Sequence, residues 1–265
     1  LRAYAHLHRV TGSPLALRVA DETAAFLLRD LGTAEGGFAS ALDADTDGVE
    51  GMTYAWTPAQ LREVLGPEDG AWAAELLTVT EAGRFEHGAW PRQLRADPAE
   101  PPRWERVRAA LLTARAVRPQ PARDDKVVTA WNGLAIVALA EGGAALDRPT
   151  WVTAAARAAD LLLDRHVVEG RLRRSSRGGV VGAAAGVLDD HAALADGLLA
   201  LHQATGASRW LAAATDLLDV TLAHFADGSG DGVVYDTADD AEALLHRPRE
   251  ITDGATPCGS SALAS

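Results

Sequence analysis

Hydrophobic residues recur at three- and four-residue spacing along most of the chain, which is the pattern of amphipathic α-helices. Start and stop signals mark where these helices begin and end. Ser13-Pro14 opens a helix that we predict to end at Gly32, and Thr57-Pro58 opens one that ends at Gly66. We predict further helices over about 67–77, 102–117, 127–146, 150–167, 190–205 and 208–225, and a short strand at Val233–Asp236. The pattern therefore predicts an all-α fold.

The predicted helices recur in pairs. The sequence Leu7-His-x-x-Thr-Gly12 returns as Leu201-His-x-x-Thr-Gly206, each time between two helices. Trp151 and Trp210 occupy matching positions of second helices, each followed by an alanine-rich stretch. Such repeats are typical of stacked helical hairpins, each of which buries its apolar face on its neighbours. We therefore expect a single domain over residues 1–265, an incomplete (α/α)6 toroid.

Both ends of the chain interrupt a helical pattern. Leu1, Tyr4 and Leu7 already stand at helical spacing, and Ser260–Ser265 opens another helix. We expect a fragment, truncated at both ends, of a longer protein.

The connections between hairpins are long, glycine-rich and acidic, whereas those within hairpins are short. We expect the long connections, with their short β segments, to emerge on one face. First helices are predicted to begin at Asp124-Asp125, Asp189-Asp190 and Asp253-Gly254. Helix capping explains each acid alone, but together they indicate an acidic mouth. The connections are 33–56, 118–125, 168–189 and 227–253.

The first long connection carries Asp43, Asp45 and Asp47 in the spacing that opens a calcium-binding EF-hand loop. Tyr54, however, occupies the twelfth position, where that loop requires a bidentate glutamate. We therefore predict no metal here. The acids, followed by Tyr54 and Trp56, indicate a sugar site, since a sugar ring needs hydrogen-bond acceptors and a flat apolar face. A solvated polar loop is the alternative.

The stretch 123–133 contains the only lysine and the only asparagine of the chain, Lys126 and Asn132, against 24 arginines. Lysine supplies a point charge that the planar arginine fork cannot copy. Asparagine and Gly133 are poor choices inside a helix. A structural Asp125–Lys126 ion pair and a core position for Trp131 are the alternatives, but we favour a functional role.

Asp190 and His191 place a carboxylate beside an imidazole at a predicted helix start. Such a histidine can be tuned as a proton donor or acceptor near neutral pH, although a lone histidine is more often a satisfied hydrogen-bond partner. The chain contains no glycine-rich phosphate loop, serine-nucleophile elbow or zinc signature. We therefore predict neither a cofactor nor a metal.

Composition excludes several kinds of partner. The net charge of −12 argues against nucleic acid, which requires clustered basic residues. No apolar run approaches the length that a membrane span needs, and no secretion signal opens the chain. A single cysteine, Cys258, excludes a disulfide within the chain. We expect a cytoplasmic protein.

Four motifs in order resemble one family, the YyaL-like, spermatogenesis-associated, thioredoxin-domain-containing proteins. They are Gly36-Gly-Phe…Asp43-Ala-Asp…Glu50-Gly…Tyr54-x-Trp56, Arg123-Asp-Asp-Lys…Trp131-Asn-Gly133, Leu188-Asp-Asp190 and Asp253-Gly-Ala-Thr-Pro257. The resemblance implies a six-hairpin α/α toroid, similar to N-acylglucosamine 2-epimerases and several glycoside hydrolases, and a thioredoxin-like domain in the same full-length protein. Leu42 and His191 stand where many members have Glu and Tyr.

We predict a carbohydrate-active enzyme of glycoside hydrolase or sugar epimerase type. Glycoside cleavage needs one protonated and one ionised carboxyl group, which Asp43 or Asp45 and Asp125 or Asp190 would supply, whereas His191 would serve epimerisation. The alternative is a non-catalytic module that binds a ligand or a protein alongside the thioredoxin-like domain. The predicted substrate-binding residues are Tyr54, Trp56, Lys126, Trp131, Asn132, Tyr235 and Asp253.

Overall fold

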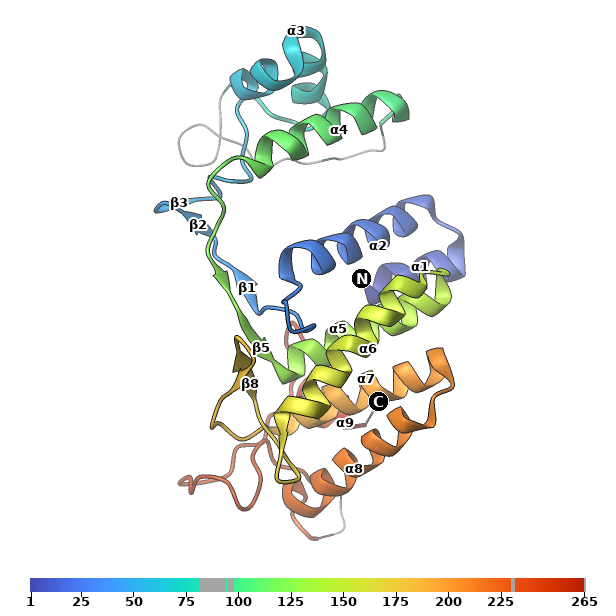
Figure 1. The fold of residues 1–265 in the computed structure, drawn as a ribbon, viewed down its shortest axis with the longest axis vertical. Coiled ribbons are helices and arrows are strands. Elements are labelled where there is room, and N and C mark those ends of the chain that lie inside the picture. Colours follow the sequence, from blue (N-terminus) through green and yellow to red (C-terminus); the bar gives the residue numbers. More distant parts are fainter. Residues whose placement is uncertain (82–93, 95–97, 230–231, 265) are drawn as a thin grey trace. The chain divides into compact units, whose positions relative to one another are not determined.

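Helices account for most of the described residues, as the hydrophobic periodicity predicted. A computed structural model describes residues 1–81, 94, 98–229 and 232–264 (Figure 1). The chain divides into two compact units, Leu1–Ala41 with Asp125–Ser265 (unit 1) and Leu42–Asp124 (unit 2). A single domain over residues 1–265 stays a prediction.

Unit 1 consists of helical hairpins. α1 (Arg2–Thr11) pairs with α2 (Pro14–Phe26), α5 (Thr129–Ala145) with α6 (Pro149–Leu161), and α7 (Leu188–Thr205) with α8 (Ser208–Phe225). The second helices α2 and α6 each end in a π-helical turn, Leu27–Leu31 and Leu162–His166. A short helix, α9 (Gly259–Leu263), follows and packs on α7. The pairing predicted from the repeats is confirmed.

The two copies of the repeated motif form the same turn. Gly12 and Gly206 both have φ 69°, the left-handed conformation that favours glycine after a helix. In both copies the threonine hydroxyl donates to the leucine carbonyl four residues earlier, and the histidine Nδ1 contacts the carbonyl of the residue after the glycine. The motif therefore specifies a hairpin turn by local interactions alone.

First and second helices are buried differently. α5 and α7 bury residues around most of their circumference, whereas α2, α6 and α8 bury a single stripe. α1 packs on α5, α5 on α7 and α7 on α9, so first helices lie side by side, and α1, α5 and α7 are each covered by their own second helix. Trp151 and Trp210 are buried at the third residue of α6 and α8. This two-layer arrangement is that of an α/α toroid.

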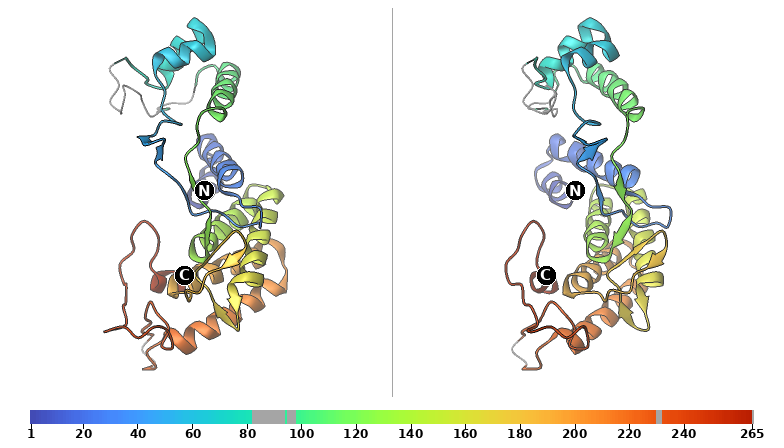
Figure 2. Two further views of the ribbon diagram at one scale, coloured as in Figure 1. Left: turned by 60° about the vertical axis from the view of Figure 1, so that its left-hand side comes forward. Right: turned by 90° about the vertical axis from the view of Figure 1, so that its left-hand side faces the viewer.

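The long connections of unit 1 lie at the end of the hairpins opposite the short turns (Figure 1). β5 (Lys126–Val128), β8 (Ser175–Arg177) and β9 (Val180–Val181) form an antiparallel sheet, and β6 (Val167–Val168) pairs with β7 (Arg171–Leu172). Between α8 and α9 the chain runs outside the helices (Figure 2). Within unit 1 the predicted gathering of these connections on one face is confirmed.

Two predicted helix starts and one predicted strand are wrong. Lys126–Val128 pairs with β8, so α5 begins at Thr129 and Asp124-Asp125 is not at its N-terminus. α9 begins at Gly259, after the predicted Asp253. Val233–Asp236 forms a single bridge, Ala226 to Val234, rather than a strand. The pairing of Lys126–Val128 with a distant strand delays the start of α5, and Val234 has too little pairing to form a strand.

Unit 2 consists of α3 (Pro58–Leu76), α4 (Pro101–Ala116) and short strands. α3 is kinked at Gly66, where the helix was predicted to end, and Thr57 caps it. Trp56 and Leu61 are in the apolar core between the two helices. The strands are β1 (Ala41–Leu42), which pairs with β4 (Arg123–Asp124), and β2 (Asp45–Thr46), which pairs with β3 (Val49–Glu50).

The β2–β3 hairpin accounts for part of the calcium-like sequence. Asp47 (φ 53°) and Gly48 (φ 78°) are the two residues of its turn, both with the positive φ that a type I′ turn requires. Asp-Gly is a preferred pair for such turns. The spacing of this motif therefore has a structural explanation.

Candidate functional site

Asn132 connects the first turn of α5 to the loop before unit 2. Its Oδ1 accepts a hydrogen bond from the Phe38 amide (2.7 Å), and its Nδ2 donates to the carbonyls of Phe38 and Val128 (3.0 Å each). The side chain is 1% exposed. Both Nδ2 hydrogens bind backbone carbonyls, and the binding of substrate hydroxyls by this amide stays a prediction. Asn132 joins two of the four motifs structurally.

Gly133 permits the close approach of α5 and α7. A Cβ atom at this position would lie 2.5 Å from the carbonyl carbon and oxygen of Ala193. Real Cβ atoms do not approach backbone so closely, and only glycine fits. The unusual Asn-Gly pair inside a helix is therefore explained by packing.

Asp190 connects the starts of α5 and α7. Its carboxylate accepts hydrogen bonds from the amides of Ala130 and Val187 (2.9 Å each) and from Arg174 Nη1 (3.0 Å). Burial raises its pKa, although the Val187 amide, Arg174 and the Ala130 amide oppose the rise. The residue has no exposed surface, so the structure places it in a buried tie between hairpins rather than at an open mouth.

His191 is buried beside Phe225, with ring centroids 4.9 Å apart. Burial, with the positive charge of Arg171, lowers the pKa of His191 to about 4. Its Nδ1 has no hydrogen-bond partner among the described residues. The imidazole is therefore neutral at pH 7 and carries an unsatisfied buried nitrogen, which normally costs stability.

Other predicted residues of unit 1 remain at the surface. Lys126 is exposed on β5 opposite Arg177, Asp125 is half-buried beside it, and Trp131 is 52% exposed on α5. The indole of Trp131 is thus open for stacking, and the core alternative for this residue is wrong. The role of these three residues at a substrate site stays a prediction.

Tyr235 and Asp253 lie in the segment between α8 and α9. The Arg247 guanidinium stacks 4.3 Å from the centre of the Tyr235 ring. Asp253 is exposed, and its carboxylate accepts the Cys258 amide (3.0 Å), a hydrogen bond that lowers its pKa. Both residues organise the loop that leads into α9.

Unit 2 holds the remaining predicted residues. Asp43 and Asp45 are exposed. Tyr54 is half-buried, with the Arg115 guanidinium 5.2 Å from its ring centre. Trp56 has no exposed surface, and the Arg118 guanidinium covers its ring at 3.7 Å. No face of Trp56 is open in this conformation, and its stacking on a sugar stays a prediction.

A cavity of about 140 Å³ in unit 1 is lined by none of the residues predicted from sequence. Glu141 of α5 and Asp196 of α7 contribute its acidic side chains, and their side chains are 20% and 27% exposed. Gln203 adds an amide. The remaining lining residues are small or apolar and come from α7, α8 and α9: Ala192, Ala195, Leu199, Ala200, Leu218, Ala262 and Leu263.

Arg2 and His6 of α1 hold the two acids of this cavity. Arg2 donates to Glu141 through Nε (2.7 Å) and Nη2 (2.8 Å), and its Nη1 lies 3.5 Å from Asp196 Oδ2. His6 Nε2 donates to Glu141 Oε2 (2.8 Å). No local sequence pattern marks this group, because its four residues lie on three helices that are distant in sequence.

The two carboxyl groups differ in acidity. Burial alone would raise the pKa of Glu141, but the hydrogen bonds from Arg2 and His6 outweigh it and lower the pKa. Burial raises the pKa of Asp196, and the nearby Glu141 carboxylate adds to the rise against the opposing charge of Arg2. Titratable neighbours whose pKa values are pushed apart are typical of acid–base pairs.

His166, also missed from sequence, lies in a buried hydrogen-bond chain. Thr129 Oγ1 donates its one hydrogen to the Arg173 carbonyl (2.7 Å), so it must accept from His166 Nδ1 (2.7 Å). His166 Nε2 therefore accepts from Ser176 Oγ (2.8 Å). Burial lowers the pKa of His166 to about 4. These hydrogen bonds connect α5, the π-helical turn after α6 and β8, and Ser176 is buried.

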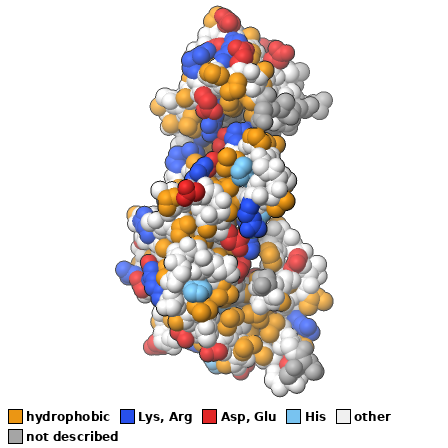
Figure 3. All heavy atoms as spheres, turned by 90° about the vertical axis from the view of Figure 1, so that its right-hand side faces the viewer, with side chains coloured by type: hydrophobic (Ala, Val, Ile, Leu, Met, Phe, Trp, Pro, Cys, Tyr) orange, Lys and Arg blue, Asp and Glu red, His pale blue; other side chains and the backbone are white. Residues whose placement is uncertain are grey.

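On the face drawn in Figure 3, basic side chains are interspersed with acidic and hydrophobic ones rather than gathered into a track. Among the described residues, no helix is long and apolar enough to cross a membrane.

The chain has relatives among proteins of known sequence. No protein-family model matches the chain. Spermatogenesis-associated protein 20 of rat is 32% identical over 309 aligned positions that cover 98% of this chain, and the human protein is 30% identical over 99% of it. The chain spans 39% of the length of either relative.

Two solved structures, a sugar epimerase and a glucuronyl hydrolase, match the chain with TM-scores below 0.5. A sugar epimerase from a ruminal bacterium matches with a TM-score of 0.43 at 13% identity, over 99% of this chain and 67% of that one. The unsaturated glucuronyl hydrolase of Bacillus sp. GL1 matches with a TM-score of 0.38 at 14% identity, over 88% and 63%. Over the 39% of their length that it spans, the chain is homologous to the spermatogenesis-associated protein 20 of human and of rat, as its four motifs predicted.

Proposed function

We propose that the protein is a carbohydrate-active enzyme that performs acid–base chemistry on one sugar unit in the cavity between α5, α7, α8 and α9. The observation that carries the proposal is the pair Glu141 and Asp196, two carboxyl groups on one cavity with pKa values shifted in opposite directions. This pair replaces the acids predicted from sequence, of which Asp190 is committed to backbone amides.

The roles of the two acids follow from their surroundings. Asp196, whose pKa is raised, is the proton donor, and Glu141, kept ionised by Arg2 and His6, is the base or nucleophile. Glycoside cleavage requires this combination, and epimerisation likewise needs one donor and one acceptor. The cavity is smaller than the roughly 300–1,000 Å³ of drug-sized ligand sites, which favours a single ring.

The exposed motif residues of unit 1 belong to the same proposal. Asp125, Lys126 and Trp131 would bind outlying parts of a glycan through charge and stacking. Asp43 and Asp45 of unit 2 are not part of the cavity and are kept as the alternative catalytic acids predicted from sequence. A cytoplasmic location is also proposed, supported by Cys258, a buried free thiol.

The test is a screen of glycans and sugar phosphates on the full-length protein, comparing Glu141→Gln and Asp196→Asn with wild type. Loss of a general acid or base should lower the rate by about 10²–10⁴-fold. Asp216→Asn, at an exposed position of α8, is the matched control. Turnover that is unchanged in both cavity variants would remove the assignment.

The same screen includes Asp43→Asn and Asp125→Asn. If either variant loses turnover while the cavity variants keep it, the acids predicted from sequence are the catalytic ones and the cavity pair is not.

A second candidate, a non-catalytic module, is supported by the buried ties of Asp190 and Asn132, since these motif residues hold hairpins together. The partner would be the thioredoxin-like domain of the same full-length protein. Calorimetric titration of that domain into this chain tests the candidate: saturable heat supports it, and the absence of heat at high micromolar concentration rejects it.

A further inference from the structure

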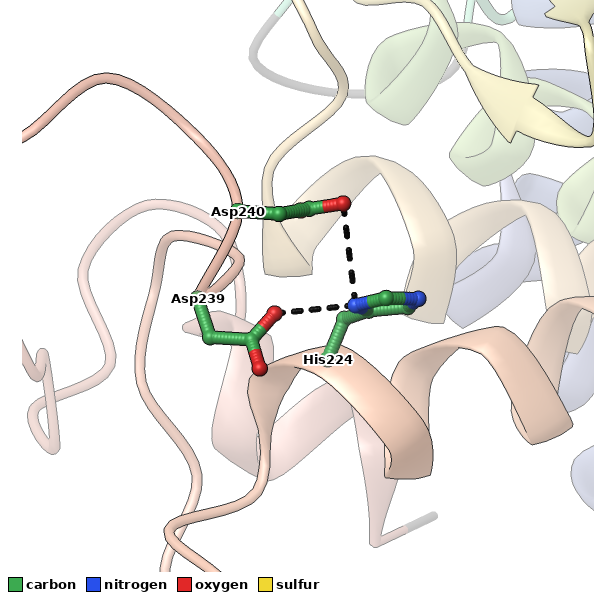
Figure 4. Close-up of side chains that lie close together, drawn as sticks. All are labelled: His224, Asp239 and Asp240. Carbon is green, nitrogen blue, oxygen red and sulfur yellow. Dashed lines mark hydrogen bonds and ion pairs between the residues drawn. The ribbon is translucent and has the colours of Figure 1, made fainter.

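Three metal-ligating side chains meet at the C-terminal end of α8. His224 lies in the last turn of α8, and Asp239 and Asp240 lie in the segment that follows (Figure 4). His224 Nδ1 lies 2.8 Å from Asp239 Oδ1 and 3.7 Å from Asp240 Oδ2. One ligand atom from each residue lies within 4.8 Å of the others. Neither the motifs nor the proposed function uses this group.

The separations suit one small cation. Two atoms bound to Zn²⁺ at roughly 2.0–2.2 Å in tetrahedral geometry lie about 3.3–3.6 Å apart. His224 Nδ1 lies 2.8 Å and 3.7 Å from the two carboxylates, and all three ligand atoms are within 4.8 Å of one another, so rotation of the exposed aspartate side chains can bring them into one coordination sphere. Both aspartates point at the same nitrogen of His224 (Figure 4).

The backbone holds the group in place. The Asp239 amide donates to the His224 carbonyl (2.8 Å), and Arg247 Nη2 donates to the same carbonyl (3.0 Å). Ala238, directly before the aspartates, is buried in an apolar cluster with Phe225. The two segments therefore present their ligands from anchored positions.

The charge of the group favours a cation, with one competitor. Arg171 forms an ion pair with Asp240 through both carboxylate oxygens. Two carboxylates, those of Asp239 and Asp240, face one guanidinium in this group. An incoming cation must displace Arg171 from Asp240, and this requirement distinguishes metal binding from a purely structural ion-pair network.

We propose that His224, Asp239 and Asp240 form a binding site for a divalent transition-metal ion, Zn²⁺ in the first instance. One imidazole and two carboxylates match Zn²⁺ better than Mg²⁺ or Ca²⁺, which take oxygen ligands. The side chains of Asp239 and Asp240 are 55% and 50% exposed. An ion can therefore enter from solvent, and three protein ligands leave a position for water.

The test is calorimetric titration of Zn²⁺ into the metal-free full chain, with Mg²⁺ as a parallel arm. We expect one saturable Zn²⁺ site of micromolar affinity or better. Outer-shell changes at metal sites typically weaken binding by 10–100-fold, so losing a ligand in His224→Gln or the nearly isosteric Asp239→Asn should cost at least about 10-fold. His246→Gln, at an exposed histidine elsewhere, is the control.

Arg171→Gln gives the decisive comparison. Because Arg171 competes with the ion for Asp240, its removal should tighten Zn²⁺ binding, whereas a structural ion-pair network would loosen without it. Far-UV circular dichroism verifies the fold of each variant. No Zn²⁺ binding, binding unchanged in both ligand variants, binding of Mg²⁺ as tight as Zn²⁺, or weaker binding in Arg171→Gln overturns the proposal.

Discussion

Lowering the pH should destabilise the protein through one buried imidazole, His166. In the unfolded chain this histidine takes up a proton near its ordinary pKa of 6.5, whereas burial in the folded protein holds the pKa at about 4. Between these values the unfolded state binds more protons, so the free energy of unfolding falls as the pH is lowered. The stability is present above pH 6.5 and is lost progressively toward pH 4.

The magnitude follows from the two pKa values. At about 1.36 kcal/mol per pH unit, the interval from 6.5 to about 4 corresponds to roughly 3 kcal/mol for complete titration. Between pH 7 and pH 5 the linkage relation gives a loss of about 2 kcal/mol. The estimate needs little correction for solvent screening, because His166 has no exposed surface.

The assay is urea unfolding of the full chain at pH 7, 6 and 5, with wild type compared with His166→Phe. Groups such as Asp190 and Asp196, whose raised pKa values act in the opposite direction, are common to both proteins and cancel. The wild type should lose about 2 kcal/mol more than the variant. The exposed His246→Gln serves as the control for losing any histidine.

Parallel pH dependences of wild type and His166→Phe would refute the reasoning. If that variant does not fold, the test is made on the wild-type protein by following the side-chain ¹⁵N chemical shift of His166 with pH. A midpoint near 6.5 rather than about 4 would also refute the reasoning.

Three further predictions concern the motif residues. Asn132→Leu should lower the free energy of unfolding by about 2–4 kcal/mol, because it leaves a buried amide and two carbonyls unpaired; a loss below 0.5 kcal/mol would show that the tie is not needed. Gly133→Ala should lower the free energy of unfolding, because the clash of its Cβ with the backbone of α7 costs more than the ~1 kcal/mol that alanine gains in helix propensity. A rise in melting temperature would contradict the close approach of the two helices. His191→Phe removes the unpaired buried Nδ1 but also the hydrogen bond between the imidazole and the Leu217 backbone, so the two effects should offset and the free energy of unfolding should change by less than about 1 kcal/mol; a larger shift of the urea midpoint in either direction would contradict this balance.

The hairpins were predictable because their signals are local. Ser13 caps α2 through its hydroxyl, and the left-handed Gly12 and Gly206 end α1 and α7 as the repeated motif required. The strand at Lys126–Val128 was not predictable in this way. Its partner, Ser175–Arg177, lies in a distant connection, and three residues carry too little periodicity to reveal pairing.

The candidate site was predicted less well than the fold. The motif residues were recognised as unusual, but unusual composition does not separate a catalytic residue from a packing residue. Asn132 and Asp190 turned out to bind backbone, whereas Glu141 and Asp196 carry no signal in their own segments. Their pairing depends on Arg2 and on the approach of three helices.

By itself the sequence determined the helical hairpins, their turns and their family, because capping residues, left-handed glycines and apolar spacing act within a few residues of the chain. Only the tertiary structure decided which acids share a cavity, which polar residues are buried in ties and which histidines are held neutral. These properties depend on burial and on contacts between distant segments, such as that of Arg2 with Glu141, which no local pattern records.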